Sequence, residues 1–204
     1  MTEVNRLVEV PDQRNLSTLK DYDIPHQECL WDAFRSGCES SFIRIYEIYV
    51  SDLFDYGCKF SDDEELVKDA IQDLFVEIRT NRQKLGKTGS IKFYLFKALR
   101  RKVVREKNTL LHKVIPLDQI THFELTFSHE QILINQQIQE EQVKQLNTAL
   151  KKMTTRQREM VYYYFFEDLS YEQIKEIMGF SSLKATRTLL YRTIDFLKST
   201  LIKK

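Results

Sequence analysis

Proline placement is the feature that most limits how this chain can fold. The 204 residues contain three prolines, Pro11, Pro25 and Pro116, and only five glycines, so long stretches have no proline at all. Proline removes a backbone donor and clashes inside a helix, so such stretches favour helices. Apolar residues make up 42% of the chain, which suffices for packed cores and argues against wholesale disorder. The sequence therefore predicts an all-α protein.

Apolar periodicity divides the chain into two helical parts. Residues at three- and four-residue spacing form helix faces in both parts, and between them the pattern weakens around Pro116. We therefore expect two small helical domains joined by a flexible linker. The expected segments are an N-terminal extension (1–25), a first domain (26–108), the linker (109–137) and a second domain (138–204).

The second domain carries the clearest local signals. Two pairs have the spacing of capping boxes, in which side chains satisfy the free backbone donors at a helix start. Gly179 follows the second of the helices that these pairs begin, where a left-handed glycine commonly ends a helix. Either Ser181 or Ser182 can then cap a third helix. The capping-box pairs are Thr154 with Gln157 and Ser170 with Gln173.

The third helix of this domain has one cationic, hydrogen-bonding side. At about 100° per residue, Ala185, Leu189 and Thr193 fall on the opposite, packing side, with Phe196 and Leu197. A short helix, a glycine turn and such a helix form the helix-turn-helix layout, whose second helix enters the major groove. The alternative is a polar face that is merely solvated. The predicted duplex contacts are Ser182, Lys184, Arg187, Thr188, Tyr191 and Arg192.

Charge is zoned along the first domain. The net charge of +1 at first argues against a nucleic-acid binder. However, residues 61–77 hold seven acidic side chains and one basic one, whereas residues 79–107 hold eleven basic side chains and one acidic one. A chain with such zones can carry an acidic partner surface and a phosphate-binding surface, whatever its total charge.

The basic zone contains a helix that we expect to begin after Ser90. Ile91, Leu95 and Leu99 share one face, and Phe93 lies among basic residues on the other. An aromatic ring among cations can stack an unpaired base, and the polar loop before the helix can line a pocket for an extruded base. The alternative is that Phe93 is a core residue and the cations only solubilise the helix. The predicted single-strand contacts are Lys84, Lys87, Ser90, Lys92, Phe93, Lys97, Arg100 and Arg101.

The acidic zone contains a helix whose apolar stripe runs over residues 66–78. On its outer face Val76 is an apolar side chain among charged ones, which is typical of a protein-binding patch in which charges steer and an apolar group anchors. A plain solvated face is the alternative. The predicted protein contacts are Asp69, Gln72, Asp73 and Val76.

Cysteine usage and hydropathy exclude several classes of protein. Cys29, Cys38 and Cys58 are an odd number without close pairing, which indicates a reducing cytoplasm. His26 and Cys29 are only half of a zinc site, and Cys58 has no His or acid in a nucleophile arrangement, so we predict no metal, no cofactor and no catalytic residue. No apolar run approaches the roughly 18 residues of a membrane span, so no membrane insertion is expected.

Taken in order, four segments resemble the extracytoplasmic-function group of bacterial sigma factors. Residues 69–75 resemble the segment that binds the coiled coil of the polymerase clamp subunit, and residues 92–101 resemble the segment that melts and reads the −10 element. Residues 115–118 resemble the start of the linker that threads through the polymerase. Residues 154–174 resemble region 4, whose last helix reads the −35 element.

The resemblance implies a sigma factor, with region 2 in the first domain and region 4 in the second. Its implied partners are core RNA polymerase, through the clamp coiled coil and the flap region, promoter DNA, and an anti-sigma factor. The family usually has Val or Ile early in the recognition helix, where this chain has Ala185 and Thr186. The aromatic run at residues 162–166 is interpreted as core packing. The rival functions are a dimeric helix-turn-helix regulator and an adaptor that binds polymerase without DNA.

Overall fold

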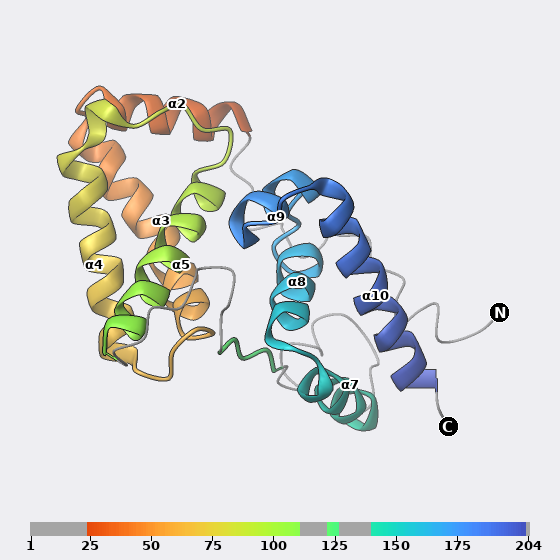
Figure 1. The fold of residues 1–204 in the computed structure, drawn as a ribbon. Helices are drawn as coiled ribbons and strands as arrows, with labels where there is room; N and C mark the ends of the chain where they lie inside the picture. The colour runs from red at the N-terminus through yellow and green to blue at the C-terminus, as the bar shows by residue number, and fades with distance from the viewer. Residues whose placement is uncertain (1–23, 111–121, 127–139, 203–204) are drawn as a thin grey trace. The chain divides into compact units, whose positions relative to one another are not determined.

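Figure 1 shows the computed structural model, which describes residues 24–110, 122–126 and 140–202. Within these ranges the regular structure is helical, which confirms the all-α prediction. None of the described helices is long and apolar enough to cross a membrane. Residues 1–23 of the expected N-terminal extension and the polymerase-threading motif at residues 115–118 lie outside the described residues, and the first described helix begins at Ile24, just before Pro25.

The chain separates into two compact units, as expected for two small helical domains. Among the described residues, the division falls between His122 and Phe123. We call the described residues of the first unit the N-terminal module and those of the second unit the C-terminal module. The linker boundaries expected from the sequence stay a prediction.

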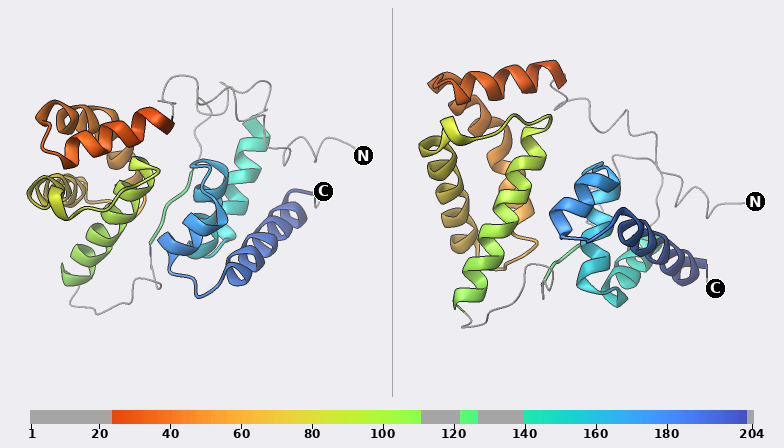
Figure 2. Two further views of the ribbon diagram at one scale, coloured as in Figure 1. Left: turned by 90° about the horizontal axis from the view of Figure 1, so that it is seen from above. Right: turned by 45° about the horizontal axis from the view of Figure 1, so that its top comes forward.

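The N-terminal module is a bundle in which one helix lies across the end of three others (Figures 1 and 2). The crossing helix is α2, and the last helix, α5, contacts α2, α3 and α4. A short 3-10 turn, η2, and a loop lead into α5. The elements are α2 (Ile24–Arg35), α3 (Glu39–Gly57), α4 (Glu64–Thr80), η2 (Arg82–Lys84) and α5 (Ile91–Leu110).

Aromatic rings from different helices meet in the core of the N-terminal module. Trp31 of α2, Tyr56 of α3 and Phe96 of α5 are each at most 1% exposed. The rings of Tyr56 and Phe96 stack with their centroids 4.2 Å apart, and Trp31 lies 5.0 Å from the ring of Tyr94. Each such pair adds about 0.5–1.5 kcal/mol beyond simple burial, so these contacts fix how the helices meet.

The connection between α3 and α4 follows from two local features. Asp63 caps α4 by accepting hydrogen bonds from the backbone N–H groups of Glu65 and Leu66, both at 3.1 Å. Helix α3 ends at Gly57, where an added Cβ would lie 2.5 Å from Cγ1 of Val67. The glycine therefore permits a close approach between the end of α3 and the first turns of α4.

The C-terminal module is built around its last helix, α10, which contacts the three helices before it. Its core contains Met160, Tyr163 and Ile174, none of which is exposed. Figure 2 shows α10 as the longest helix of this module. The elements are α7 (Glu140–Lys152), α8 (Thr155–Phe165), α9 (Tyr171–Met178) and α10 (Leu183–Ile202).

The aromatic run at residues 162–166 is only partly core. Tyr162 and Tyr163 are buried, and the Tyr163 hydroxyl donates to the buried carboxylate of Glu159 at 3.0 Å. Phe166, however, is 50% exposed, so the interpretation of the whole run as core is wrong at its end. The run spans a helix end, where successive side chains point to different sides, so not all five can face inward.

A short extended segment belongs to the core of the C-terminal module. Phe123 and Leu125 are 0% and 4% exposed, although both lie in the linker expected from the sequence. The guanidinium of Arg158 donates to the carbonyl oxygens of Phe123 at 2.8 Å and Met153 at 2.7 Å. Arg158 thereby ties the segment to the turn between α7 and α8.

Candidate nucleic-acid interface

Capping residues set the helix-turn-helix of the C-terminal module. Helices α8 and α9 begin with the two capping boxes that the sequence predicts, at Thr154 and Ser170. Gly179 ends α9 with φ of 69°, in the left-handed region that glycine adopts without strain. Of the two expected caps for α10, Ser182 accepts a hydrogen bond from the backbone N–H of Ala185 at 3.2 Å.

The outer face of α10 is polar and cationic, as the helical period predicts. Its buried side holds Thr186, Leu190 and Thr193, whereas Ala185 and Leu189 are only half-buried, so the packing face lies slightly to one side of the predicted one. The threonines reach the interior because their hydroxyls donate to backbone carbonyls of α10 or of its cap. The exposed side chains are Ser182, Lys184, Arg187, Thr188, Tyr191 and Arg192.

Two cation–π contacts brace this helix-turn-helix. The guanidinium carbon of Arg156 lies 4.3 Å from the ring centroid of Phe180, and its terminal nitrogen donates to the carbonyl of Met178 at 3.4 Å. The guanidinium carbon of Arg187 lies 5.4 Å from the ring centroid of Tyr171. The first contact holds the turn, and the second joins α10 to the start of α9.

Helix α5 of the N-terminal module carries most of the predicted single-strand contacts. Lys92, Phe93 and Lys97 are half-buried, and Arg101 is exposed. The prediction that Arg100 contacts a single strand is wrong, because its side chain is only 3% exposed and has no surface on which to meet DNA. The helical period assigned it to an outer face, but neighbouring helices cover α5 on more than one side.

The loop between η2 and α5 is held by two side chains of α2. The indole N–H of Trp31 donates to the carbonyl of Gly86 at 2.9 Å, and Nε of Arg35 donates to the carbonyl of Leu85 at 2.7 Å. At the end of the loop, Ser90 caps α5 by accepting from the backbone N–H of Phe93. Neither anchor was predicted from the sequence. The signal that could have pointed to the first is that Trp31 is the only tryptophan in the chain.

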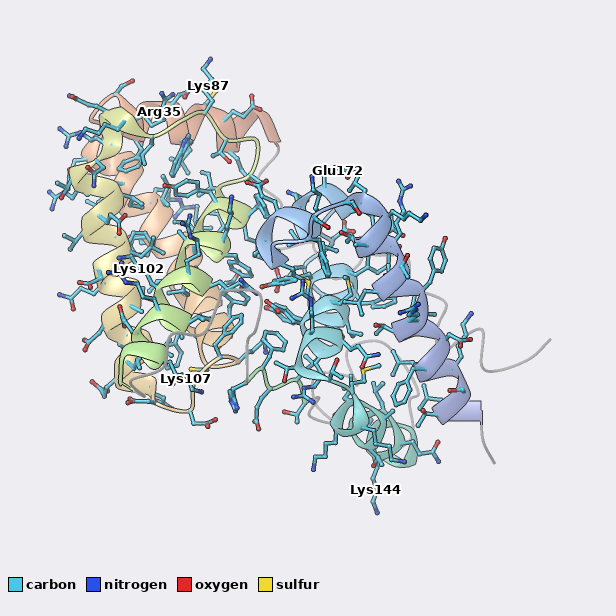
Figure 3. The ribbon with its side chains drawn as sticks, viewed as in Figure 1. Arg35, Lys87, Lys102, Lys107, Lys144 and Glu172 are labelled. Atoms are coloured by element: carbon cyan, nitrogen blue, oxygen red, sulfur yellow. The ribbon has the colours of Figure 1, made fainter. Side chains whose placement is uncertain are left out.

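A small hollow of 170 Å³ lies between this loop and α2. Lys87 projects at its rim, near Arg35 at the same end of the module (Figure 3). The predicted cations Lys84, at the end of η2, and Lys87, in the loop, are both exposed, whereas the acidic walls of the hollow come from α2 and were not predicted. The lining residues are Glu28, Asp32, Lys87, Thr88 and Gly89.

The predicted protein-binding face of α4 is exposed. Val76 is 57% exposed, so its apolar side chain is available to a partner. Asp69 and Asp73 lie on the side of α4 toward Glu106 of α5. Burial of the Glu106 carboxyl, and then the charges of these two carboxylates, raise the pKa of Glu106. Nearby, Lys102 of α5 pairs with Glu77 of α4 at 2.7 Å (Figure 3). Asp69, Gln72, Asp73 and Val76 are all exposed.

On its other side, Val76 borders an open groove of 640 Å³ between α3 and α4. The groove is mostly apolar and includes Tyr46, which is 44% exposed. The helical period alone would put Tyr46 on the buried face of α3, because residue spacing does not show where two helices diverge. The lining residues are Phe42, Tyr46, Val50, Ser51, Phe54, Lys68, Ile71, Gln72, Phe75, Val76 and Arg79.

Two other kinds of site, a cysteine nucleophile and a metal site, gain no support in the described part of the chain. Burial and then the charge of Glu64 raise the pKa of the Cys58 thiol, which is the opposite of an activated nucleophile. Within the described residues, no three His, Cys, Asp or Glu side chains are arranged to hold a metal ion. The side chain of His26, from the half zinc site, lies outside the described residues.

Comparison with known proteins identifies the family of the C-terminal module. Residues 144–194 match the family model of sigma-70 region 4. No curated protein matches the chain in sequence.

Two solved structures share the fold. CnrH, solved in complex with the cytosolic domain of CnrY, is 18% identical, with a TM-score of 0.54 over 85% of this chain and 96% of that one. The sigma factor RpoE of Bartonella quintana, solved with the anti-sigma factor NepR, is 16% identical, with a TM-score of 0.53 over 80% of this chain and 98% of that one. The family model thus confirms the resemblance to region 4, and the solved structures confirm the fold that the resemblance implied.

Proposed function

We propose that this chain, a sigma factor by its region 4 module and by its fold, binds core RNA polymerase and directs initiation at specific promoters. The observation that carries the proposal is the exposed cationic face of α10, presented by a capped helix-turn-helix within the matched region 4. A second helix of this kind enters the major groove and reads base edges. We assign α10 to the −35 element.

The duplex contacts are proposed for the exposed side chains of α10. Lys184 and Arg187 can bond guanine edges or phosphates. Thr188 and Tyr191 can likewise bond base edges or phosphates. Binding should weaken steeply with salt, because bound cations displace counterions from the phosphates.

The −10 element is proposed to meet α5 and the loop before it. Phe93 offers a half-buried ring, and the neighbouring lysines and Arg101 can follow a strand backbone. The hollow between the loop and α2 can take an extruded base, so that binding offsets the cost of opening the duplex. Arg100 is left out of this set, since it is buried.

Core polymerase is proposed to bind the exposed face of α4 through the coiled coil of its clamp subunit, and region 4 is proposed to meet the flap region. The acidic Asp69 and Asp73 favour a basic partner surface, and Val76 supplies an apolar anchor. RpoE was solved with an anti-sigma factor, and CnrH with the cytosolic domain of CnrY. We therefore further propose that an anti-sigma factor controls this chain. The proposed function places the protein in the bacterial cytoplasm, without a catalytic step.

Run-off transcription with core polymerase on a random promoter library tests this function and yields the recognised elements. We expect transcripts from a small subset of promoters only when the chain is added. If core polymerase gains no promoter-specific initiation, the proposal is wrong. Palindromic sites bound by a dimer without polymerase would instead support a helix-turn-helix regulator, and polymerase binding without salt-dependent DNA binding would support an adaptor.

Two variants separate the proposed surfaces. Asp73→Lys reverses a charge on α4 and should weaken polymerase binding while duplex binding is unchanged. Arg187→Ala should weaken duplex binding by about 10-fold, the lower range for one good base contact, while polymerase binding is unchanged. Equal loss of both activities in either variant would contradict this division.

A further inference from the structure

We propose that Tyr171 is a positioning residue for Arg187 and that the pair selects a guanine-containing base pair in the −35 element. The inference rests on the proposed function, because it concerns how the recognition helix reads its site. Tyr171 does not lie on the recognition helix and carries no charge, so no DNA-contact pattern in the sequence points to it.

The geometry places Tyr171 between two helices. It is the first residue of α9, directly after the cap Ser170, and its ring lies below the guanidinium of Arg187 in α10 at 5.4 Å. The same ring also lies 5.7 Å from that of Tyr164, near the end of α8. Tyr171 is therefore held from α8 while it touches α10.

Arg187 is distinguished by this contact from the other cations of the recognition face. Among the described residues of the C-terminal module, the structure places a ring against Arg187 but against neither Lys184 nor Arg192. A ring face attracts a cation without using any of its N–H donors. The donors of Arg187 therefore stay available for DNA although its position is restricted.

This restriction matters because arginine has many rotamers, whereas recognition of guanine requires one geometry. An arginine bonds O6 and N7 of guanine through two parallel N–H groups, which is the commonest specific contact in the major groove. A guanidinium already held on the side of α9 loses less freedom when it forms that fork. Tyr171 thus acts on discrimination between bases, through Arg187.

The test uses the full-length chain and three substitutions. Tyr171→Leu removes the aromatic face and keeps an apolar side chain at the position. Tyr171→Phe keeps the face and loses only the hydroxyl. Lys198→Ala is the matched control, because it removes an exposed cation of α10 that lies outside the proposed duplex contacts, and it should leave discrimination unchanged. Thermal unfolding of each variant establishes that the C-terminal module is intact.

The first measurement is made without DNA. The Nε–H resonance of Arg187, observed by NMR, should carry a ring-current shift in the wild type and in Tyr171→Phe, and should lose it in Tyr171→Leu. An unchanged resonance in Tyr171→Leu would overturn the positioning role, whatever the protein binds. This outcome is independent of the proposed function.

The second measurement is the affinity for −35 duplexes that differ at each base pair. Tyr171→Leu should reduce discrimination about two- to five-fold at the pair for which Arg187→Ala relaxes specificity, which is the size of an exposed cation–π contact. In an Arg187→Ala background the same substitution should have no further effect, and Tyr171→Phe should stay near wild type. A uniform loss at every base pair, or full discrimination in Tyr171→Leu, would overturn the proposal.

The two readouts also separate this inference from the proposed function. If the wild-type chain shows no sequence-specific duplex binding, the assignment of α10 to the −35 element fails, and the selection of guanine by this pair is overturned with it. The NMR result then still decides whether Tyr171 holds Arg187.

Discussion

The two modules reach well-defined surfaces by different routes. In the C-terminal module the recognition helix is set by contacts close in sequence, namely two capping boxes, a left-handed Gly179 and a serine cap. In the N-terminal module the loop before α5 is held by side chains that are distant in sequence. The Trp31–Gly86 bond joins residues 55 positions apart, and the Arg35–Leu85 bond joins residues 50 positions apart.

The difference teaches which kind of change each surface can tolerate. A helix-turn-helix held by local caps loses its geometry when a cap or the turn glycine is changed. A loop held by a distant helix loses its geometry when that helix moves, even if the loop sequence is intact. The following predictions test this contrast, from the largest expected effect to the smallest.

The largest effect is expected for Trp31→Ala in the N-terminal module. Trp31 is 0% exposed and also holds the loop through Gly86, so its loss leaves a cavity and an unanchored loop. We expect a loss of about 3–5 kcal/mol in the stability of this module, typical of a large aromatic truncation. Segment-resolved hydrogen exchange should show lost protection in α2–α5 only. An equal loss in α8–α10 would break the separation of the modules.

A smaller effect is expected for Gly57→Ala. The added Cβ would lie 2.5 Å from Cγ1 of Val67, so α3 and α4 must move apart. Overpacking of this kind costs about 1–3 kcal/mol, which denaturant unfolding can measure. Gly89→Ala is the matched control, because no atom lies within 4 Å of its added Cβ. Similar stabilities for the two variants would contradict the close approach.

In the C-terminal module the corresponding test is Gly179→Ala. Space is not limiting there, since nothing lies within 4 Å of an added Cβ, but φ of 69° strains a residue with a side chain. We expect a loss of about 1–2 kcal/mol, with weaker duplex binding. Gly179→Asn should lose less, because asparagine tolerates this region. If alanine and asparagine are equal, backbone strain is not the reason for glycine at this turn.

The smallest perturbation is chemical and leaves the fold unchanged. A side-chain hydrogen bond with Ser40, followed by bonds with Ser41, lowers the pKa of the Cys38 thiol to about 7, whereas burial raises that of Cys58. The thiolate is the reactive form, so alkylation of Cys38 should rise with pH to half its maximum near pH 7. Cys58 should react only at higher pH.

Mass spectrometry after iodoacetamide treatment can follow both thiols, with labelling of Cys38 at pH 7 at least about 10-fold faster. Because residues 123–204 contain no cysteine, this chemistry reports on the N-terminal module alone. Equal rates for the two thiols across the pH range would contradict the assigned environments.

Sequence patterns predicted most of the C-terminal interface. The caps, the glycine turn and the outward face of α10 all depend on residues within four positions of each other, which is the range of helical periodicity. The same reasoning misplaced the packing face slightly, since it did not include Thr186, whose hydroxyl is satisfied by the carbonyl of the cap Ser182. Tyr171 was missed because its contact with Arg187 crosses between helices.

Patterns predicted less of the N-terminal interface. They placed the acidic face of α4 and the cap at Ser90 correctly, but they assigned Arg100 to the surface. A helix covered by several neighbours has no single buried stripe, so its period does not tell which polar residue is inside. The groove beside Val76 and the acidic walls of the loop hollow depend on tertiary contacts, which residue spacing does not encode.

The two hydrogen bonds from α2 to the loop before α5 have a consequence for the cost of the proposed capture of a base. A free loop must be ordered when its ligand arrives, and each backbone residue so fixed opposes binding by about 1–2 kcal/mol of entropy. Here Trp31 and Arg35 order Gly86 and Leu85 during folding. The proposed receptor for a flipped base is therefore preorganised, so that little ordering of the loop is left to oppose binding.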